Sequence, residues 1–219
     1  GVPVAIKNAL QDAMEIALEN VPEVAGRVVV CPDVSGSMAS PVTGYRPGAT
    51  SAVRCIDVAA LVAAAFLRRN PATRVLPFEQ RVVDIRLNAR DSVMTNATKL
   101  AAIGGGGTNC TAPLRQLIDE KAKVDLVVFI SDNESWVDAG PAQRRGTSML
   151  IDWERLKSWN PDAKLVCIDI QPSTTSQVVG RDDILNVGGF SDRVFELIGS
   201  FVQAGGKDHW VELIEATEL

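Results

Sequence analysis

Residues 126–130, Leu-Val-Val-Phe-Ile, form an unbroken run of apolar side chains rich in strand-forming types. The run lacks the polar and apolar alternation of a half-exposed strand, so both of its faces are expected to be buried. Strands buried on both faces are typical of parallel sheets, whose connections usually contain helices. Residues 125–130 therefore predict a buried strand of a parallel α/β sheet.

The rest of the chain alternates between helical and strand-like patterns. Further strands are predicted at residues 27–31, 164–170 and 184–187, and a hairpin at 74–78 and 81–87. Helices are predicted at residues 4–18, 57–69, 92–103, 111–123, 148–159 and 191–202. This order predicts a doubly wound, mostly parallel central sheet with helices on both faces and one antiparallel edge strand.

Length and composition fit one domain. The 219 residues can bury a substantial core, and we interpret residues 1–219 as a single domain excised from a longer protein, since no initiator Met is present. Residues 205–219 stay undecided between strand and helix. A net charge of −5 argues against non-specific nucleic-acid binding by the whole domain, although arginines gather in residues 41–90.

The chain shows no sign of a membrane or secretory destination. No apolar run reaches the roughly 20 residues of a membrane span. The first helical segment contains Asp12, Glu15 and Glu19, so it does not resemble a signal peptide. The four cysteines lack CxxC spacing, which favours reduced, buried thiols in a cytoplasmic protein.

Oxygen-bearing side chains follow the first strand at two-residue spacing. Asp33, Ser35 and Ser37 come directly after residues 27–31, where alternate side chains of an extended segment point the same way. A carboxylate with two hydroxyls suits Mg²⁺, which prefers about six oxygen ligands. Ligands of open α/β sheets bind outside the carboxyl ends of the strands. A cation site is therefore expected at this edge.

Two later segments supply further oxygen ligands. Thr108 follows four glycines at 104–107, and Asp132 follows the buried strand 125–130. The alternative is that Asp33, Ser35 and Thr108 merely cap helices. Without the Lys-Ser/Thr that a phosphate-binding loop requires, the glycines do not predict a nucleotide site.

The set Asp33-x-Ser35-x-Ser37, Thr108 and Asp132 resembles the metal-ion-dependent adhesion site of von Willebrand factor A (vWA) domains. Segments 106–110 (Gly-Gly-Thr-Asn-Cys), 132–134 (Asp-Asn-Glu) and 188–192 (Gly-Gly-Phe-Ser-Asp) are similar to the vWA domain of the Ro ribonucleoprotein family, which carries a TROVE module. The similarity extends to about Val202 and points to a bacterial orthologue. It departs at Asn109, where Asp is expected, and in the long loop 41–54.

The resemblance implies a Mg²⁺ site, with Mn²⁺ or Ca²⁺ as alternatives. Ser35, Ser37 and Thr108 would bind the ion directly, and Asp33 and Asp132 wholly or partly through water. A carboxylate of a protein partner, or an RNA phosphate, would complete the shell. Further residues expected to support the ligands or to contact a partner are Asn133, Glu134, Arg46 and Arg54.

Family members bind Y RNAs and misfolded RNA, mainly through a ring of helical repeats that this sequence lacks. The resemblance therefore implies a recognition domain without catalysis, acting in Y RNA particle assembly or RNA quality control. An extracellular adhesion-type vWA domain is the alternative. A metal-dependent hydrolase is a third, weakened because the only histidine is His209 and no Gly-x-Ser-x-Gly motif occurs.

Overall fold

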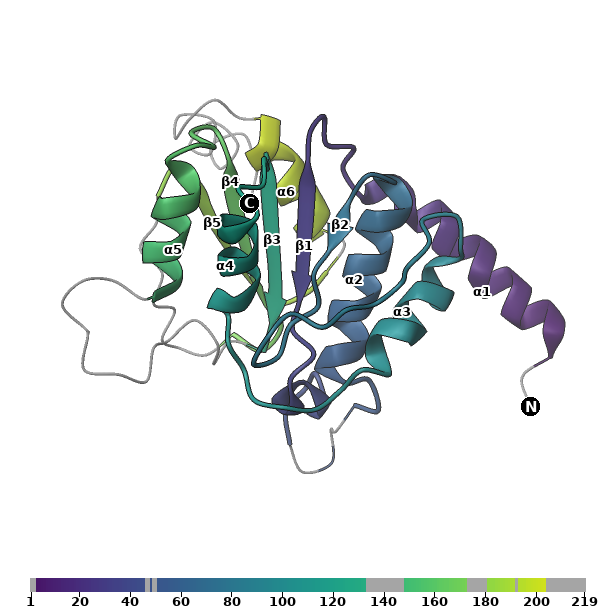
Figure 1. The fold of residues 1–219 in the computed structure, drawn as a ribbon. Coiled ribbons are helices and arrows are strands. Elements are labelled where there is room, and N and C mark those ends of the chain that lie inside the picture. Colours follow the sequence, from purple (N-terminus) through teal and green to yellow (C-terminus); the bar gives the residue numbers. More distant parts are fainter. Residues whose placement is uncertain are drawn as a thin grey trace, which may run out of the picture.

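The computed structural model describes residues 3–45, 48, 51–132, 148–172, 181–191 and 193–203. Five parallel strands form one sheet in the order β2-β1-β3-β4-β5 (Figure 1). The strands are β1 (Val28–Pro32), β2 (Arg74–Val75), β3 (Leu126–Ser131), β4 (Lys164–Asp169) and β5 (Ile184–Gly188). The helices are α1 (Val4–Ala17), η1 (Leu18–Asn20), η2 (Gly36–Ala39), α2 (Cys55–Arg69), α3 (Val93–Ala101), α4 (Thr111–Asp119), α5 (Ser148–Lys157) and α6 (Arg193–Gln203).

Helices cover both faces of the sheet. One core cluster joins α2, α3 and α6 to alternate strand residues such as Val128, and the other joins α4 and α5 to intervening residues such as Val127. Every residue of β3 is buried. The prediction of a strand buried on both faces is confirmed, and so is the doubly wound α/β class.

The predicted antiparallel edge strand is not present among the described residues. β2 is two residues long and pairs in parallel with β1. The segments predicted to form the hairpin share one antiparallel bridge, between Phe78 and Val82. Val83 N donates to Pro77 O over 2.8 Å, but Pro77 has no N–H to donate in return. The antiparallel ladder therefore stops after one bridge, and the described strands are all parallel.

The first helix, α1, confirms the predicted helical periodicity but stands apart from the body of the domain (Figure 1). Its C-terminal end is anchored, because Leu18 is buried and Arg68 pairs with Glu15 at 3.3 Å. Toward its N-terminus, Val4 and Leu10 are exposed. The segment 205–219 lies outside the described residues.

Candidate metal centre

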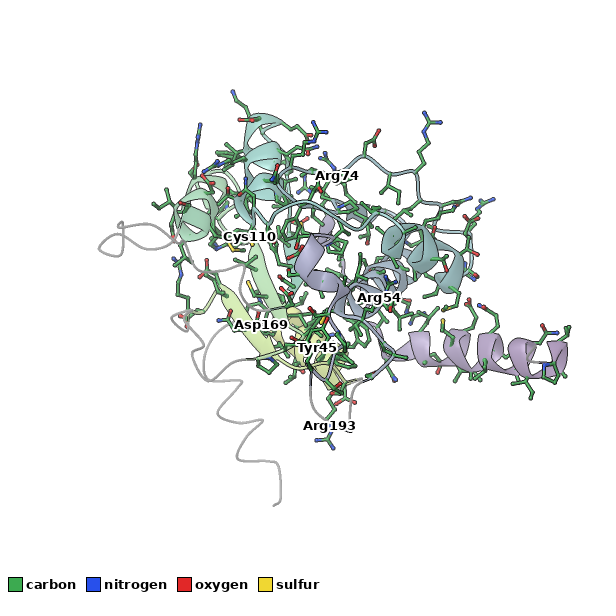
Figure 2. The ribbon with its side chains drawn as sticks, turned by 90° about the horizontal axis from the view of Figure 1, so that it is seen from below. Tyr45, Arg54, Arg74, Cys110, Asp169 and Arg193 are labelled. Carbon is green, nitrogen blue, oxygen red and sulfur yellow. The ribbon has the colours of Figure 1, made fainter. Side chains whose placement is uncertain are left out.

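The ends of β1 and β3 place the first and last predicted ligands on neighbouring strands. Pro32 pairs with Ile130, and Asp33 N donates to Ile130 O over 2.9 Å. Asp132 follows Ser131, the last residue of β3. Asp33 and Asp132 therefore leave the sheet at the same carboxyl edge, which Figure 2 views from below.

The carboxylate of Asp33 is fully buried and held at both oxygens. Ser35 N donates to Oδ1 over 2.8 Å, and Ser131 Oγ donates to Oδ2 over 2.7 Å. Hydrogen bonds from two directions fix the orientation of this carboxylate without any helix cap. Such an arrangement suits a carboxylate that approaches a cation through water.

The two serine hydroxyls lie side by side, with Ser35 Oγ and Ser37 Oγ 3.2 Å apart. Ser35 is buried, whereas Ser37 is exposed, so the pair reaches from the interior to the surface. Ser35 precedes η2 but makes no side-chain cap hydrogen bond there. The capping alternative therefore does not account for this hydroxyl.

The glycine loop is hydrogen-bonded directly to the loop that carries the serines. Gly36 N donates to Gly106 O over 3.1 Å, and Gly105 N donates to Val34 O over 3.2 Å. Thr108 follows on the exposed side of this contact. Two segments about 70 residues apart in sequence are thus joined at the carboxyl edge of β1, as the metal-site prediction requires.

Asn109 explains why Thr108 is not a helix cap. The Asn109 Oδ1 atom accepts a hydrogen bond from Thr111 N at 3.2 Å, in the first turn of α4. Its Nδ2 donates to Gln80 O over 3.2 Å. A carboxylate at this position would lack that donor, which gives a physical reason for Asn where the family resemblance leads us to expect Asp.

Asp132 lies close enough to α2 for its charge to affect the pKa of Cys55, the first residue of that helix. The Oδ1 atom of Asp132 is buried. Burial raises the pKa of the Cys55 thiol to about 11, and the negative charge of Asp132 contributes to that rise. Asp132 therefore lies near the N-terminal end of α2, at the carboxyl edge of the sheet.

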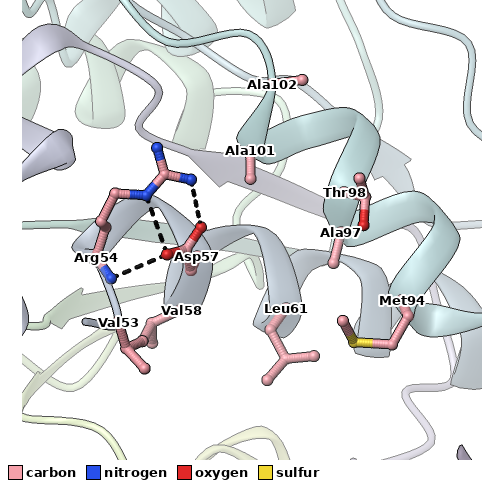
Figure 3. A pocket seen from close by; sticks show the side chains of 10 residues that line it. All are labelled: Val53, Arg54, Asp57, Val58, Leu61, Met94, Ala97, Thr98, Ala101 and Ala102. Atoms are coloured by element: carbon pink, nitrogen blue, oxygen red, sulfur yellow. Dashed lines mark hydrogen bonds and ion pairs between the residues drawn. The ribbon is translucent and has the colours of Figure 1, made fainter. Parts of the chain in front are cut away.

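Of the four further residues predicted to support the ligands or contact a partner, the structure describes Arg54 alone. Arg54 precedes α2 and pairs with Asp57 at 2.6 Å, and this hydrogen-bonded partner holds the pKa of Asp57 below its usual value. The Arg54 guanidinium is therefore bound at the start of α2 (Figure 3). No hydrogen bond or ion pair among the described residues joins it to the loops that carry the candidate ligands. Arg46, Asn133 and Glu134 lie outside the described residues.

The donor chemistry fits a hard cation. Within the described ranges, no cluster of three or more His, Cys, Asp or Glu side chains could hold a metal. The candidate set instead contains Asp33 and Asp132 with three hydroxyls, a set that suits Mg²⁺ retaining some of its waters. The sequence analysis did not single out Ser131. The feature that could have identified it is a hydroxyl at the end of an otherwise apolar strand.

Taken together, the sheet order, the covering helices and the loops at the carboxyl edge define a doubly wound α/β domain of the vWA type. The family model described as "Ro60 vWA domain" matches residues 27–202, and the chain belongs to this family. The predicted resemblance is thereby confirmed.

Similar proteins agree with this assignment. The chain is 26% identical over 199 residues to the RNA-binding protein RO60 of Deinococcus radiodurans, covering 90% of this chain and 36% of that protein. It is 23% identical over 203 residues to RNA-binding protein RO60 of Caenorhabditis elegans, covering 90% of this chain and 29% of that protein. The chain thus spans about a third of these relatives' length.

A solved structure supports the fold. The crystal structure of the Deinococcus radiodurans RO (RSR) protein matches with a TM-score of 0.71 at 20% identity, covering 91% of this chain and 38% of that chain. Among the helices that the structure describes, none is both long and apolar enough to cross a membrane.

Proposed function

We propose that this chain is a divalent-cation-dependent recognition domain of a Ro-type RNA-binding protein, and that it works without catalysis. The observation that carries the proposal is the Asp33 carboxylate held at both oxygens beside the paired hydroxyls of Ser35 and Ser37. Family membership supports the RNA-associated role, since the curated relatives are named RNA-binding proteins.

The cation would be held by Ser35, Ser37 and Thr108, with Asp33 and Asp132 acting wholly or partly through water. Mg²⁺ is the preferred ion, because most of these ligands are neutral oxygens and Mg²⁺ keeps several waters. When bound, the ion would supply an electrophilic position for an incoming anionic oxygen. We propose a protein carboxylate as that ligand, with an RNA phosphate as the alternative.

Family membership also supports a proposal for the wider role. We propose that the parent protein takes part in Y RNA particle assembly or RNA quality control, and that a helical-repeat ring beyond this domain makes most RNA contacts. All four cysteines are buried thiols, which suits a reducing compartment, and we place the protein in the cytoplasm.

The residue types of the sequence support a non-catalytic role. Ser35 Oγ lies 3.2 Å from Ser37 Oγ, and the only histidine of the sequence, His209, lies outside the described residues. A serine nucleophile needs such a base to remove its proton. With a single histidine and no Gly-x-Ser-x-Gly motif in the sequence, we favour binding over acyl transfer.

Metal binding is tested by titrating Mn²⁺ into the 219-residue chain and measuring free Mn²⁺ by electron paramagnetic resonance. We expect one site in the wild-type chain and at least tenfold weaker binding in Asp33→Ala, about 1.4 kcal/mol. Far-ultraviolet circular dichroism checks that the variant is folded. Asp162→Asn, at an exposed position away from these loops, is the matched control and should bind normally.

Two results would contradict the proposal. Equal Mn²⁺ affinity in the wild-type chain and in folded Asp33→Ala would remove Asp33 from the site. Mg²⁺-dependent cleavage of a labelled single-stranded RNA by the wild-type chain, absent in Asp33→Ala, would instead show an enzyme.

A further inference from the structure

One acidic residue lies beside the candidate metal centre without belonging to the predicted set of ligands. Glu79 follows Phe78, which forms a parallel bridge with Asp33 just beyond the paired residues of β1 and β2. Val34 N donates to Phe78 O over 2.9 Å, and Phe78 N donates to Pro32 O over 3.1 Å. Glu79 therefore leaves the sheet at the same carboxyl edge as Asp33.

The backbone of Glu79 is also joined to the segment that carries Thr108. Asn109 N donates to Glu79 O over 2.8 Å, and Asn109 Nδ2 donates to Gln80 O over 3.2 Å. Residues 78–80 are thus hydrogen-bonded both to the loop that follows β1 and to the residue that follows Thr108. Two of the three segments that carry the candidate ligands therefore fix the position of Glu79.

The side chain of Glu79 packs on the glycine loop. A Cβ added at Gly106 would collide with the Glu79 carboxylate, and one added at Gly107 would lie 3.2 Å from Nε2 of Gln80. Glycine at these two positions leaves room for the side chains of Glu79 and Gln80 to approach the backbone of the loop. The carboxylate is therefore held against the loop rather than directed away from it.

This contact brings the Glu79 carboxylate near the two serine hydroxyls. Gly106 O accepts a hydrogen bond from Gly36 N over 3.1 Å, and Gly36 is the residue between Ser35 and Ser37. Glu79 is partly buried, and its side chain makes no hydrogen bond or ion pair with another described residue. A carboxylate that is partly desolvated and lacks an opposite charge is destabilised, and a cation nearby offsets that cost.

We propose that Glu79 is a third carboxylate of the metal centre, beside Asp33 and Asp132. The inference rests on the cation site proposed above. Glu79 acts on the cation through water, since its carboxylate lies against Gly106. Cation affinity rises with the number of charged ligands. Three carboxylates around a divalent ion also leave a net charge of about −1 instead of zero, which lowers the attraction of the loaded centre for an anionic partner.

The experiment titrates Mn²⁺ into the 219-residue chain and measures free Mn²⁺ by electron paramagnetic resonance. Glu79→Gln keeps the shape of the side chain and removes its charge, so we expect about five- to tenfold weaker binding. Glu79→Asp keeps the charge and should lose no more than about threefold. Glu19→Gln is the matched control, because Glu19 is an exposed glutamate on η1, before the amino end of β1; it should bind as tightly as the wild type.

Thermal unfolding separates this electrostatic role from a structural one. Without metal, Glu79→Gln should be at least as stable as the wild type, because the substitution removes no hydrogen bond or ion pair among the described residues. At the same excess of Mn²⁺, the unfolding midpoint of the wild type should rise more than that of Glu79→Gln, since the tighter site gains more from mass action.

The outcomes distinguish this inference from the proposed function. Weaker binding in Asp33→Ala with wild-type affinity in folded Glu79→Gln would overturn the role of Glu79 and leave the cation site in place. Wild-type affinity in folded Asp33→Ala would overturn the site itself. A Glu79→Gln chain that is less stable without metal, and whose weaker binding Glu79→Asp does not restore, would assign Glu79 a structural role and overturn the inference.

Discussion

Single residues at the candidate metal centre are held by partners far away in the chain. Ser131 Oγ reaches Asp33 from 98 positions later, and Asn109 ties the glycine loop to the carbonyl of Gln80. These contacts fix a carboxylate and a loop that carry no rigid secondary structure of their own. Preorganised donors of this kind lose little entropy when a cation is bound.

Among the four loop glycines, Gly106 combines a positive φ with a close side-chain neighbour. Its φ of +74° is in the left-handed region, and a Cβ there would meet Oε2 of Glu79. We expect Gly106→Ala to lower the free energy of unfolding by about 2 kcal/mol, from backbone strain together with displacement of Glu79. Urea denaturation followed by circular dichroism measures the change.

Gly44→Ala is the matched control for this prediction. Gly44 also has a positive φ, +64°, but a Cβ there would have no neighbour within 4 Å. This variant should lose only the backbone contribution, about 1 kcal/mol. Equal losses in the two variants would show that Glu79 does not restrain the loop.

At the scale of elements, the edge of the sheet is held both by backbone pairing with β1 and by a side-chain ion pair. β2 contributes two residues to the ladder, yet Arg74 on it forms an ion pair with Glu120 at the end of α4, with Nη2 to Oε1 at 2.7 Å. The hydrogen-bonded guanidinium lowers the pKa of Glu120 to about 2. This pair couples the short edge strand to the helix layer.

The lowered pKa predicts how this pair responds to acid. A carboxyl group whose folded-state pKa is depressed stabilises the fold above its unfolded pKa and loses that contribution as pH falls toward the folded value. We expect Glu120→Gln to cost about 0.5 kcal/mol at pH 7, since both partners are partly exposed. The difference from wild type should shrink between pH 4.5 and about 2.

Urea unfolding at a series of pH values checks this expectation. Asp162→Asn, which changes an exposed carboxylate that forms no ion pair with any described residue, serves as the control for a general charge effect. A difference between wild type and Glu120→Gln that stays constant down to pH 2.5 would contradict the assignment.

At the scale of the whole molecule, the two core clusters bury all four thiols. Cys55 lies in the cluster of α2, and Cys31, Cys110 and Cys167 lie in the cluster of α4 and α5. Burial raises the pKa of Cys31 and of Cys167 above the usual thiol value, so the reactive thiolate is scarce in the native state.

We therefore expect none of the four thiols to react rapidly with Ellman's reagent in native buffer. All four should react in 6 M guanidinium, and native-state reaction should follow global unfolding, because the cysteines lie on both faces of one sheet. Absorbance at 412 nm measures the number and the rate. Rapid native reaction of even one equivalent would show that a core cluster opens locally.

Much of this architecture depends on local pattern and on the order of segments. The apolar run 126–130 determined a strand buried on both faces, because periodicity is read directly from neighbouring residues. The placement of Asp33 and Asp132 at one edge follows from chain order, since parallel strands share a carboxyl edge. Long segments with clear periodicity therefore predicted the sheet, the helices and the position of the candidate site.

Only the tertiary structure decided the features that depend on contacts between distant residues. The alternating pattern of residues 81–87 predicts a strand, but the missing N–H of Pro77 and the position of that segment limit the pairing to one bridge. Ser131 became a partner of Asp33, 98 positions away, through packing that no local pattern encodes. Among the described residues, the exposure of Val4 and Leu10 on α1 is likewise visible only once the chain is folded, because exposure depends on how distant segments pack.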